Sequence, residues 1–360
     1  MKEVNYNNAE IAGAEGVDQQ FALGAVGTKV LHRAGFLAVA ERLLAGDFLS
    51  DEDVRSLAAR AAPPVLAKLV SIMRVVQPDL CPKVTRIRPV VLLNAAEALE
   101  TKGLQAAKIE LAQRLDSVQE SGVSTNVFAA LDRWTGDFTL GELVEFLKHA
   151  LPEDFSARGF KILGPSTSEI KLLVERHSGR RSPGFGMIQV LELLHELGVT
   201  RVEGGGDLSI HRAALAGGFE VAIGQRVEFH TSSDPRSGQY PLSKSFVDEL
   251  LLVRRELAPA GKVTAWFPWA VSSSSTQLIR AIALGRLALR SVPRIRAPLS
   301  LLGPNVAQAA LEFGANDVGF AAVDSYTAQG LGICPLSEIE FLELDQTQIG
   351  GLTIPSNTDV

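Results

Sequence analysis

The sequence predicts an α/β fold: a (β/α) barrel of the TIM type, closed or incomplete, that follows an N-terminal helical extension. Two observations favour this class. After Lys83, eight short β-like runs alternate with amphipathic helices, which is the pattern typical of a parallel sheet. The chain has 360 residues, of which 46% are hydrophobic, so it is long enough to bury the core of one such barrel.

The predicted strands are short apolar runs bounded by turn residues. They span 84–93, 124–130, 161–163, 201–203, 226–230, 263–267, 294–300 and 317–321. The predicted helices carry apolar residues at three- and four-residue spacing, which packing against a sheet explains. They span 104–120, 140–150, 168–176, 186–197, 244–257, 275–289 and 305–313.

We divide the chain into an N-terminal arm with helices (1–82), the barrel (83–330) and a C-terminal tail (331–360). The first segment has helical apolar spacing, and Ser50 is placed to cap a helix that begins at Asp51. Acidic and apolar residues alternate in the tail. It either covers the barrel or forms a surface for a partner.

Composition argues against several classes of partner. The net charge is −6, and 35 basic residues are mixed with 41 acidic ones, so no basic stripe for nucleic acid is present. The N-terminus has no basic region followed by an apolar one, and no apolar stretch is of membrane-spanning length. We therefore expect a cytoplasmic protein that binds neither nucleic acid nor a membrane.

The residues that usually hold metals are sparse. Only two cysteines occur, Cys81 and Cys334, and neither belongs to a C-x-x-C unit, so we expect unpaired thiols in a reducing compartment. The six histidines show no pair at helical ligand spacing. His211 with Asp207 is the one close combination at a predicted strand end, and we expect no metal there.

Two stretches in the second half of the chain carry a family resemblance. The first runs from Pro293 to Gly303 and continues from Ala307 to Asp317, ending in phenylalanine, glycine, alanine, asparagine and aspartate. The second is the helix 190–199 followed by the triple glycine 204–206. Both resemble the radical S-adenosylmethionine (SAM) enzymes of the futalosine route to menaquinone, namely aminofutalosine synthase and dehypoxanthine futalosine cyclase, and the related FO synthase subunit.

Weaker matches at 43–50, 166–170 and 263–268 extend the resemblance over most of residues 40–325. It implies a barrel in which a C-x3-C-x2-C loop after the first strand holds a four-iron cluster. Here residues 94–103 contain no cysteine, and alanine or glutamate cannot replace soft thiolate ligands. The chain is therefore identified as a degenerate member, for which we expect neither an iron–sulfur cluster nor SAM as cofactor.

Two further departures support this expectation. Ala129 and Ala130 stand where the family has a glycine pair that lets SAM approach the backbone. The connection from Gly206 to the predicted strand 226–230 also looks too short for a complete barrel helix.

Active sites of such barrels gather at the carboxyl ends of the strands, so polar residues predicted there are candidates. Asp132, Asp207 and His230 are candidate acid–base residues, although a capped turn before Pro235 also explains the cluster at His230. Two arginines could bind a carboxylate, a tryptophan could form an aromatic wall of a pocket, and polar or glycine residues stand at strand ends. The candidate substrate-binding residues are Arg133, Glu169, Gly204, Gly205, Gly206, Arg236, Trp269 and Asn316. Ordinary ion pairing of the arginines and core packing of the tryptophan are the alternatives.

Three functions remain open at this stage. The first is an auxiliary subunit or pseudoenzyme that pairs with a radical SAM homologue, or with itself, in menaquinone or related cofactor biosynthesis. The second is a lyase, hydrolase or isomerase that acts on a carboxylated aromatic or nucleoside-like molecule. The third is a module that only binds a small molecule in the barrel mouth, for which proton-transfer groups are not needed.

Overall fold

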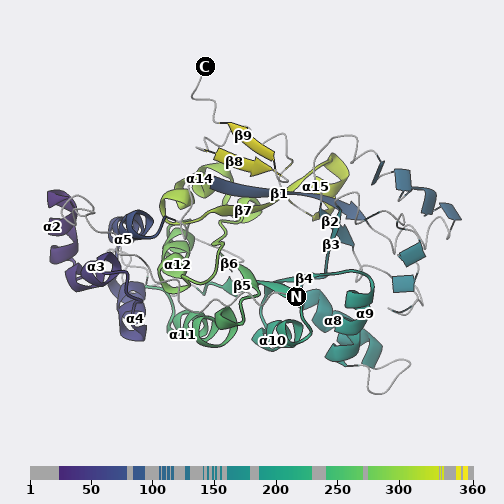
Figure 1. Ribbon diagram of the computed structural model, residues 1–360, viewed down its shortest axis with the longest axis horizontal. Coiled ribbons are helices and arrows are strands. Elements are labelled where there is room, and N and C mark those ends of the chain that lie inside the picture. Colours follow the sequence, from purple (N-terminus) through teal and green to yellow (C-terminus); the bar gives the residue numbers. More distant parts are fainter. Residues whose placement is uncertain are drawn as a thin grey trace, which may run out of the picture.

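The structure is a computed structural model that describes most of the predicted barrel and the helices before it. The described residues are 24–78, 84–93, 126–129, 160–178, 186–228, 241–270, 275–331, 346–349 and 352–355, with isolated positions between 105 and 155 and at 333 and 335. The N-terminal helices lie at one end of the molecule (Figure 1). The predicted helices 104–120 and 140–150 are described only at scattered positions, and those positions are helical.

The N-terminal extension is helical, as predicted. Ser50 Oγ accepts a hydrogen bond from Asp53 N at 3.1 Å, and Asp53 Oδ2 accepts one from Ser50 N at 2.9 Å. This capping box confirms the predicted helix start. The last two helices of the extension pack against α12 (Ser275–Ala288), whose side chains are almost all buried. The extension consists of α2 (Ala25–Arg33), α3 (Leu37–Leu44), α4 (Asp51–Arg60) and α5 (Pro63–Val76).

Strand pairing among the described residues forms two sheets. In the first, β1 pairs in parallel with β2, β7 and β8, while β3 continues from β2 and β9 is antiparallel to β8. The second has the parallel order β4–β5–β6. The strands are β1 (Val84–Leu93), β2 (Asn126–Ala129), β3 (Lys161–Leu163), β4 (Arg201–Gly205), β5 (Glu220–Arg226), β6 (Val263–Trp269), β7 (Asp317–Ala322), β8 (Gln346–Ile349) and β9 (Leu352–Pro355).

Isolated parallel bridges connect the two sheets on both sides. Ser166 after β3 pairs with Glu203 of β4, while Ile295 pairs with Trp266 of β6 and Arg296 pairs with Asp317 of β7. The strands are thus arranged in the order of a barrel. Between the two sheets, however, the described strands are connected only by these isolated bridges and not by continuous ladders of hydrogen bonds. The predicted α/β fold is confirmed as a TIM-type barrel that is incomplete in its strand pairing.

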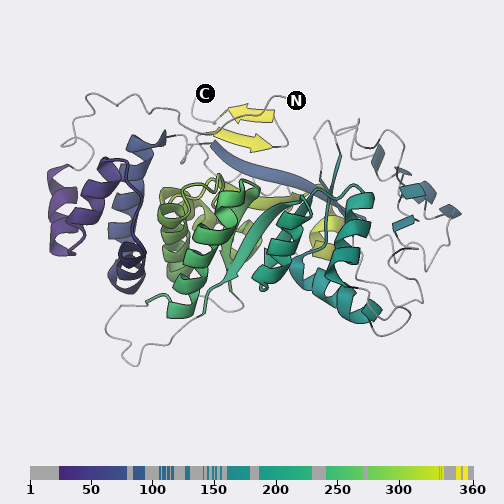
Figure 2. The same ribbon diagram turned by 60° about the horizontal axis from the view of Figure 1, so that its bottom comes forward.

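Helices lie outside the strands, and the β8–β9 pair lies over the amino-terminal half of β1 (Figure 2). Part of the C-terminal tail therefore joins the sheet. The outer helices are α8 (Thr167–Ser178), α9 (Met187–Glu196), α10 (Leu208–Ala216), α11 (Lys244–Leu252), α12, α13 (Leu299–Leu302), α14 (Pro304–Glu312) and α15 (Ser325–Leu331). A π-helical turn (Val253–Leu257) and a 3-10 turn (Ala258–Ala260) extend α11.

The predicted fifth strand at 226–230 is wrong, since β5 ends at Arg226. The alternation in 226–230 is typical of a half-buried strand, whereas a strand covered on both faces is a continuous apolar run. Val221, Ala222 and Ile223 form that run and are fully buried. The predicted loss of a barrel helix is also wrong, because α10 occupies the connection between β4 and β5 even though β5 begins earlier than predicted.

The predicted seventh strand at 294–300 is reduced to two bridged residues. Trp266 N donates to Arg294 O at 2.9 Å and Arg296 N donates to Trp266 O at 2.8 Å. Pro298 then ends the pairing because proline has no N–H for a ladder, and α13 begins after it.

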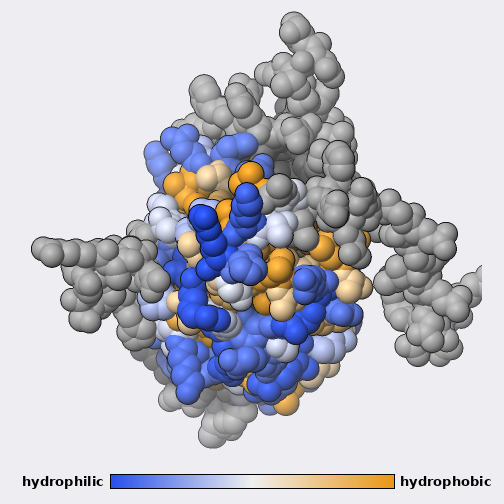
Figure 3. Space-filling model, turned by 90° about the vertical axis from the view of Figure 1, so that its left-hand side faces the viewer, coloured by the Kyte–Doolittle hydropathy of each residue, from blue (hydrophilic) through white to orange (hydrophobic). Residues whose placement is uncertain are grey.

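The end of the molecule that carries the N-terminal helices has a mostly hydrophilic surface, with apolar residues interspersed (Figure 3). Exposed apolar side chains of this region include Val26 and Phe48. In the described part of the chain, no helix combines the length and apolar character needed to cross a bilayer.

Gly285 of α12 makes close packing against the barrel possible. A Cβ there would lie 2.3 Å from Trp266 Cζ3, and the buried ring is held by a 3.1 Å hydrogen bond from its Nε1 to Gln225 Oε1. We expect Gly285→Ala to lower the free energy of unfolding, measured by urea denaturation, by about 1–2 kcal/mol despite the higher helix propensity of alanine.

The control is Gly217→Ala at the end of α10, where φ is −74° and the nearest atoms lie 3.4 Å from the added Cβ. We expect it to change the stability by less than about 0.5 kcal/mol. Equal losses in the two variants would contradict the packing argument.

Candidate functional site

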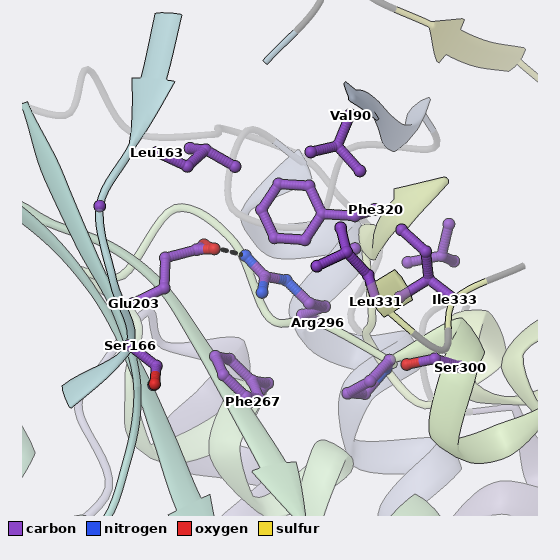
Figure 4. A pocket seen from close by; sticks show the side chains of 15 residues that line it. Val90, Leu163, Ser166, Glu203, Phe267, Arg296, Ser300, Phe320, Leu331 and Ile333 are labelled. Atoms are coloured by element: carbon purple, nitrogen blue, oxygen red, sulfur yellow. Dashed lines mark hydrogen bonds and ion pairs between the residues drawn. The ribbon is translucent and has the colours of Figure 1, made fainter. Parts of the chain in front are cut away.

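A cavity of about 290 Å³ lies inside the barrel, toward the carboxyl ends of the strands. Figure 4 shows Arg296 reaching across it toward Glu203, with Phe267 and Phe320 on opposite sides of the guanidinium group. Leu331, from α15, lines another side. The cavity is mainly apolar, and an ion pair crosses it.

Buried charged side chains from different parts of the barrel form a network beside this cavity, and Glu203 and Arg296 of this network line it. Arg88 comes from β1, Arg201 and Glu203 from β4, and Asp317 from β7, while Arg296 lies between the bridges to β6 and β7. Asp317 is fully buried and the side chain of Arg296 is 5% exposed. Since β-strand side chains alternate between faces, one charged residue in an otherwise apolar strand can be directed inward.

Each of the two carboxylates interacts with more than one arginine. Glu203 Oε1 accepts hydrogen bonds from Arg296 Nη2 at 2.8 Å and Arg88 Nη1 at 3.3 Å, and Arg201 Nε lies 3.5 Å away. Asp317 Oδ2 accepts from Arg88 Nη2 at 3.2 Å, and its Oδ1 lies 3.3 Å from Arg296 Nε. The five side chains therefore form one network.

The network keeps its carboxylates ionised. Burial would raise the pKa of Glu203, but the guanidinium groups of Arg296, Arg88 and Arg201 together lower it well below its usual range. Burial lowers the pKa of Arg88 to about 10, so this side chain still carries its charge at neutral pH. The pKa of Arg296 is raised because the two carboxylates outweigh its burial.

The triple glycine predicted as part of the site ends β4 beside the cavity. Gly204 lines it with φ +141°, and a Cβ there would lie 2.8 Å from Thr167 Oγ1. A Cβ on Gly205 would lie 2.1 Å from Nε1 of Trp269, another predicted site residue, while Gly206 has φ +115°. The structure thus brings Gly204, Gly205 and Trp269 together, although Trp269 does not line this cavity.

Glu169 and Asp207 act as helix caps. Glu169 Oε2 accepts from Ser166 N at 2.5 Å, and Ser166 Oγ accepts from Glu169 N at 3.2 Å at the start of α8. Asp207 is exposed, and its Oδ1 accepts from Ser209 N at 2.8 Å at the start of α10. Only Ser166 of these residues lines the cavity.

Asn316 was expected at the carboxyl end of a strand, and this placement is wrong because it precedes the first residue of β7. Its amide is buried and bonded to Arg286 and to the backbone of 293–295. The remaining candidates, Asp132, Arg133, His230 and Arg236, lie outside the described residues.

His211 is fully buried on α10 and supports the turn after β4. Its Nε2 donates to Gly204 O at 3.2 Å. Burial lowers the pKa of His211 below its ordinary value, although that hydrogen bond opposes the shift. The folded protein therefore resists protonation of this ring.

This residue makes stability depend on pH. Because the unfolded chain binds the proton more readily, we expect the free energy of unfolding to fall as the pH drops below about 6.5, by on the order of 1 kcal/mol per pH unit at most. His211→Gln, whose neutral amide can donate to Gly204 O, should show a shallower fall between pH 7 and 5 in urea denaturation. Parallel pH profiles of the two proteins would contradict this role.

Sequence reasoning missed the network of Arg88, Arg201, Glu203, Arg296 and Asp317. A usable signal was present, because a charged residue inside an apolar strand is rarely buried without a partner. The ion-pair partners could not be predicted from neighbouring residues in the sequence, since Arg88 and Asp317 are 229 residues apart.

The donor set does not fit the four-iron cluster of the resembled family. Three cysteine thiolates are needed in a single loop, and the whole chain has two cysteines, neither of them in residues 94–103. Within the described ranges, no group of three histidine, cysteine, aspartate or glutamate side chains is arranged to hold a metal ion.

No protein-family model matches the sequence, and no curated protein is significantly similar to it. Similar folds occur among solved structures. The FeFe-hydrogenase maturase HydG from Carboxydothermus hydrogenoformans has a TM-score of 0.50 at 12% identity, with 84% of this chain and 75% of that chain covered. A second crystal structure of HydG gives 0.51 at 10% identity, covering 87% and 75%.

Methylornithine synthase (PylB) gives a TM-score of 0.49 at 15% identity, covering 78% of this chain and 85% of that chain. At such low identities, the likeness to HydG shows the fold alone. The chain thus shares the α/β barrel fold of the two HydG structures.

Proposed function

We propose that this protein is a radical-SAM-like barrel that works without an iron–sulfur cluster of its own. Its role would be that of an auxiliary subunit or pseudoenzyme in menaquinone biosynthesis by the futalosine route, or in a related cofactor pathway. The fold supports the class, and the family resemblance of residues 293–317 supports the pathway.

The cysteine count carries the proposal. Two cysteines cannot supply the three thiolates of a site-differentiated four-iron cluster, and oxygen ligands are poor substitutes for thiolates around reduced iron. The barrel is retained while the donor set that defines the ancestral chemistry is absent from the sequence.

Anaerobic reconstitution with iron and sulfide tests this proposal. We expect no stoichiometric iron, no cluster absorption band and no SAM binding by calorimetry in the same preparation. A Cys81→Ser, Cys334→Ser double variant is the control, because any iron bound equally by both proteins is non-specific. A stoichiometric cluster that is lost in the double variant, together with SAM binding, would overturn the proposal.

One observation bears on the choice between an altered enzyme and a binding module. The carboxylates beside the cavity have lowered pKa values, and its arginines remain charged at neutral pH. A general acid or base works best with a pKa near the working pH. For the described charged residues in and beside the cavity, this favours ligand binding over a lyase, hydrolase or isomerase mechanism.

A further inference from the structure

We propose that the interior cavity binds a small monocarboxylate that carries a flat ring, and that Arg296 receives the carboxylate. This inference deepens the small-molecule part of the proposed function. It holds whether the chain works alone or beside a partner. Its test measures ligand binding and not iron, so the two proposals can fail separately.

The charge of the network favours an anion. Among the described residues, three arginines, Arg88, Arg201 and Arg296, face two carboxylates, Glu203 and Asp317, which gives these five side chains an excess of one positive charge. Arg294 also acts on Arg201 and Asp317, and its charge has the same sign as this excess. All five side chains are between 0% and 14% exposed. An unbalanced charge is costly in a barrel interior, and one bound carboxylate would neutralise it.

The hydrogen bonds leave a donor available in the cavity. Arg296 Nη2 donates to Glu203 Oε1, and its Nε faces Asp317 Oδ1. No described residue accepts a hydrogen bond from Arg296 Nη1. A guanidinium group that lines a cavity, and has an N–H with no acceptor among the described residues, is a suitable partner for a carboxylate oxygen.

The walls favour a flat ligand of one ring. The guanidinium carbon of Arg296 lies 4.7 Å from the ring centroid of Phe267 and 5.3 Å from that of Phe320. Aliphatic side chains such as Val90 and Leu163 complete the lining. The volume of about 290 Å³ is near the lower limit for small-molecule pockets.

Glu203 restricts the charge of the ligand. Its carboxylate lies 2.8 Å from Arg296 and lines the same cavity, so it would repel a second negative charge. A monocarboxylate therefore matches the site better than a phosphate dianion. A ligand with a cationic ring would be repelled by the excess positive charge of the network.

Benzoate, benzamide and benzylammonium separate these alternatives because they share one ring and differ in charge. We expect calorimetry at pH 7 to show one benzoate bound per chain, at least tenfold more tightly than benzamide, with no binding of benzylammonium. The result that overturns the proposal is benzamide or benzylammonium binding as well as benzoate, or no benzoate binding at millimolar concentration.

Three variants locate the site. Arg296→Met should abolish the preference for benzoate. Arg290→Met is the matched control, because Arg290 is also buried but donates to the backbone of Gly46 and Asp47 and does not line the cavity. Leu331→Phe, at a half-buried position of the lining, should weaken benzoate binding by filling the cavity even if Arg296→Met fails to fold. Unchanged benzoate affinity in Leu331→Phe, or a preserved preference in folded Arg296→Met, overturns the assignment.

Discussion

Replacing Asp317 by asparagine is expected to lower the free energy of unfolding by about 3–5 kcal/mol, because it removes one partner of a buried ion network. Asp317 is fully buried, and its oxygens lie 3.2 Å from Arg88 Nη2 and 3.3 Å from Arg296 Nε. Asparagine keeps the shape and can still accept the hydrogen bond from Gly319 N. It adds one unit to the excess positive charge of the five-residue network, and urea denaturation followed by circular dichroism measures the loss of stability.

The control for this variant is Asp248→Asn. Asp248 pairs with Arg55 on the surface, where its side chain is 45% exposed, so we expect a loss below about 1 kcal/mol. Equal losses in the two variants would show that the buried network does not depend on the charge of Asp317. Adding Arg88→Met to Asp317→Asn should recover part of the stability, because it removes one of the guanidinium groups that lost a partner.

The pH profile gives a second criterion for the same variant. Burial alone would raise the pKa of Asp317, but Arg88 and Arg296 lower it below its ordinary value. The stabilisation is therefore fully present above about pH 4 and is lost only at lower pH. We expect the difference between the parent chain and Asp317→Asn to stay constant from pH 5 to 8 and to shrink in stronger acid.

Local patterns were sufficient to predict much of the fold. The bounds of β1 and β3 agree with the predicted runs, and the cap at Ser50 is confirmed because a capping box depends on neighbouring residues. The fifth strand was misplaced at 226–230, where polar and apolar residues alternate as in a half-buried strand, whereas β5 is buried on both faces and contains a continuous apolar run. The local pattern could not show which strands would be covered.

The candidate site was predicted less well, for a related reason. The expectation that site residues follow the carboxyl ends of strands led to Gly204, which lines the cavity, but also to Glu169 and Asp207, which cap helices. The charged side chains of the cavity come from β4 and from an isolated bridge, and Arg296 and Glu203 meet although they are 93 residues apart. Such pairs follow from the barrel closing around them and not from a local motif.

The run from Phe313 to Asp317 shows how a motif can be structural. Asn316 Oδ1 accepts from Arg286 Nη2 at 2.8 Å and from Ile295 N at 2.9 Å, while its Nδ2 donates to Pro293 O at 3.0 Å. Arg286 is fully buried and also donates from Nε to Gly314 O at 2.8 Å. One amide thus joins α12 to the short bridged segment before α13.

Asn316→Ala is therefore expected to lower the free energy of unfolding by on the order of 3 kcal/mol, because it leaves buried groups without their partner, one of them charged. Asn316→Asp should cost less, since its oxygens can still accept from Arg286 and Ile295. Asn305→Ala, at an exposed position of α14, is the matched control and should change the stability by less than about 0.5 kcal/mol.

The same variants decide between the two roles considered for Asn316. If the role of the Asn316 amide is structural, folded Asn316→Asp should bind benzoate with unchanged affinity, because Asn316 does not line the cavity. A variant with parental stability and weakened binding would instead support the substrate contact expected from its assumed strand-end position. Stability and binding measured on one preparation therefore separate a core hydrogen-bonding residue from a ligand residue.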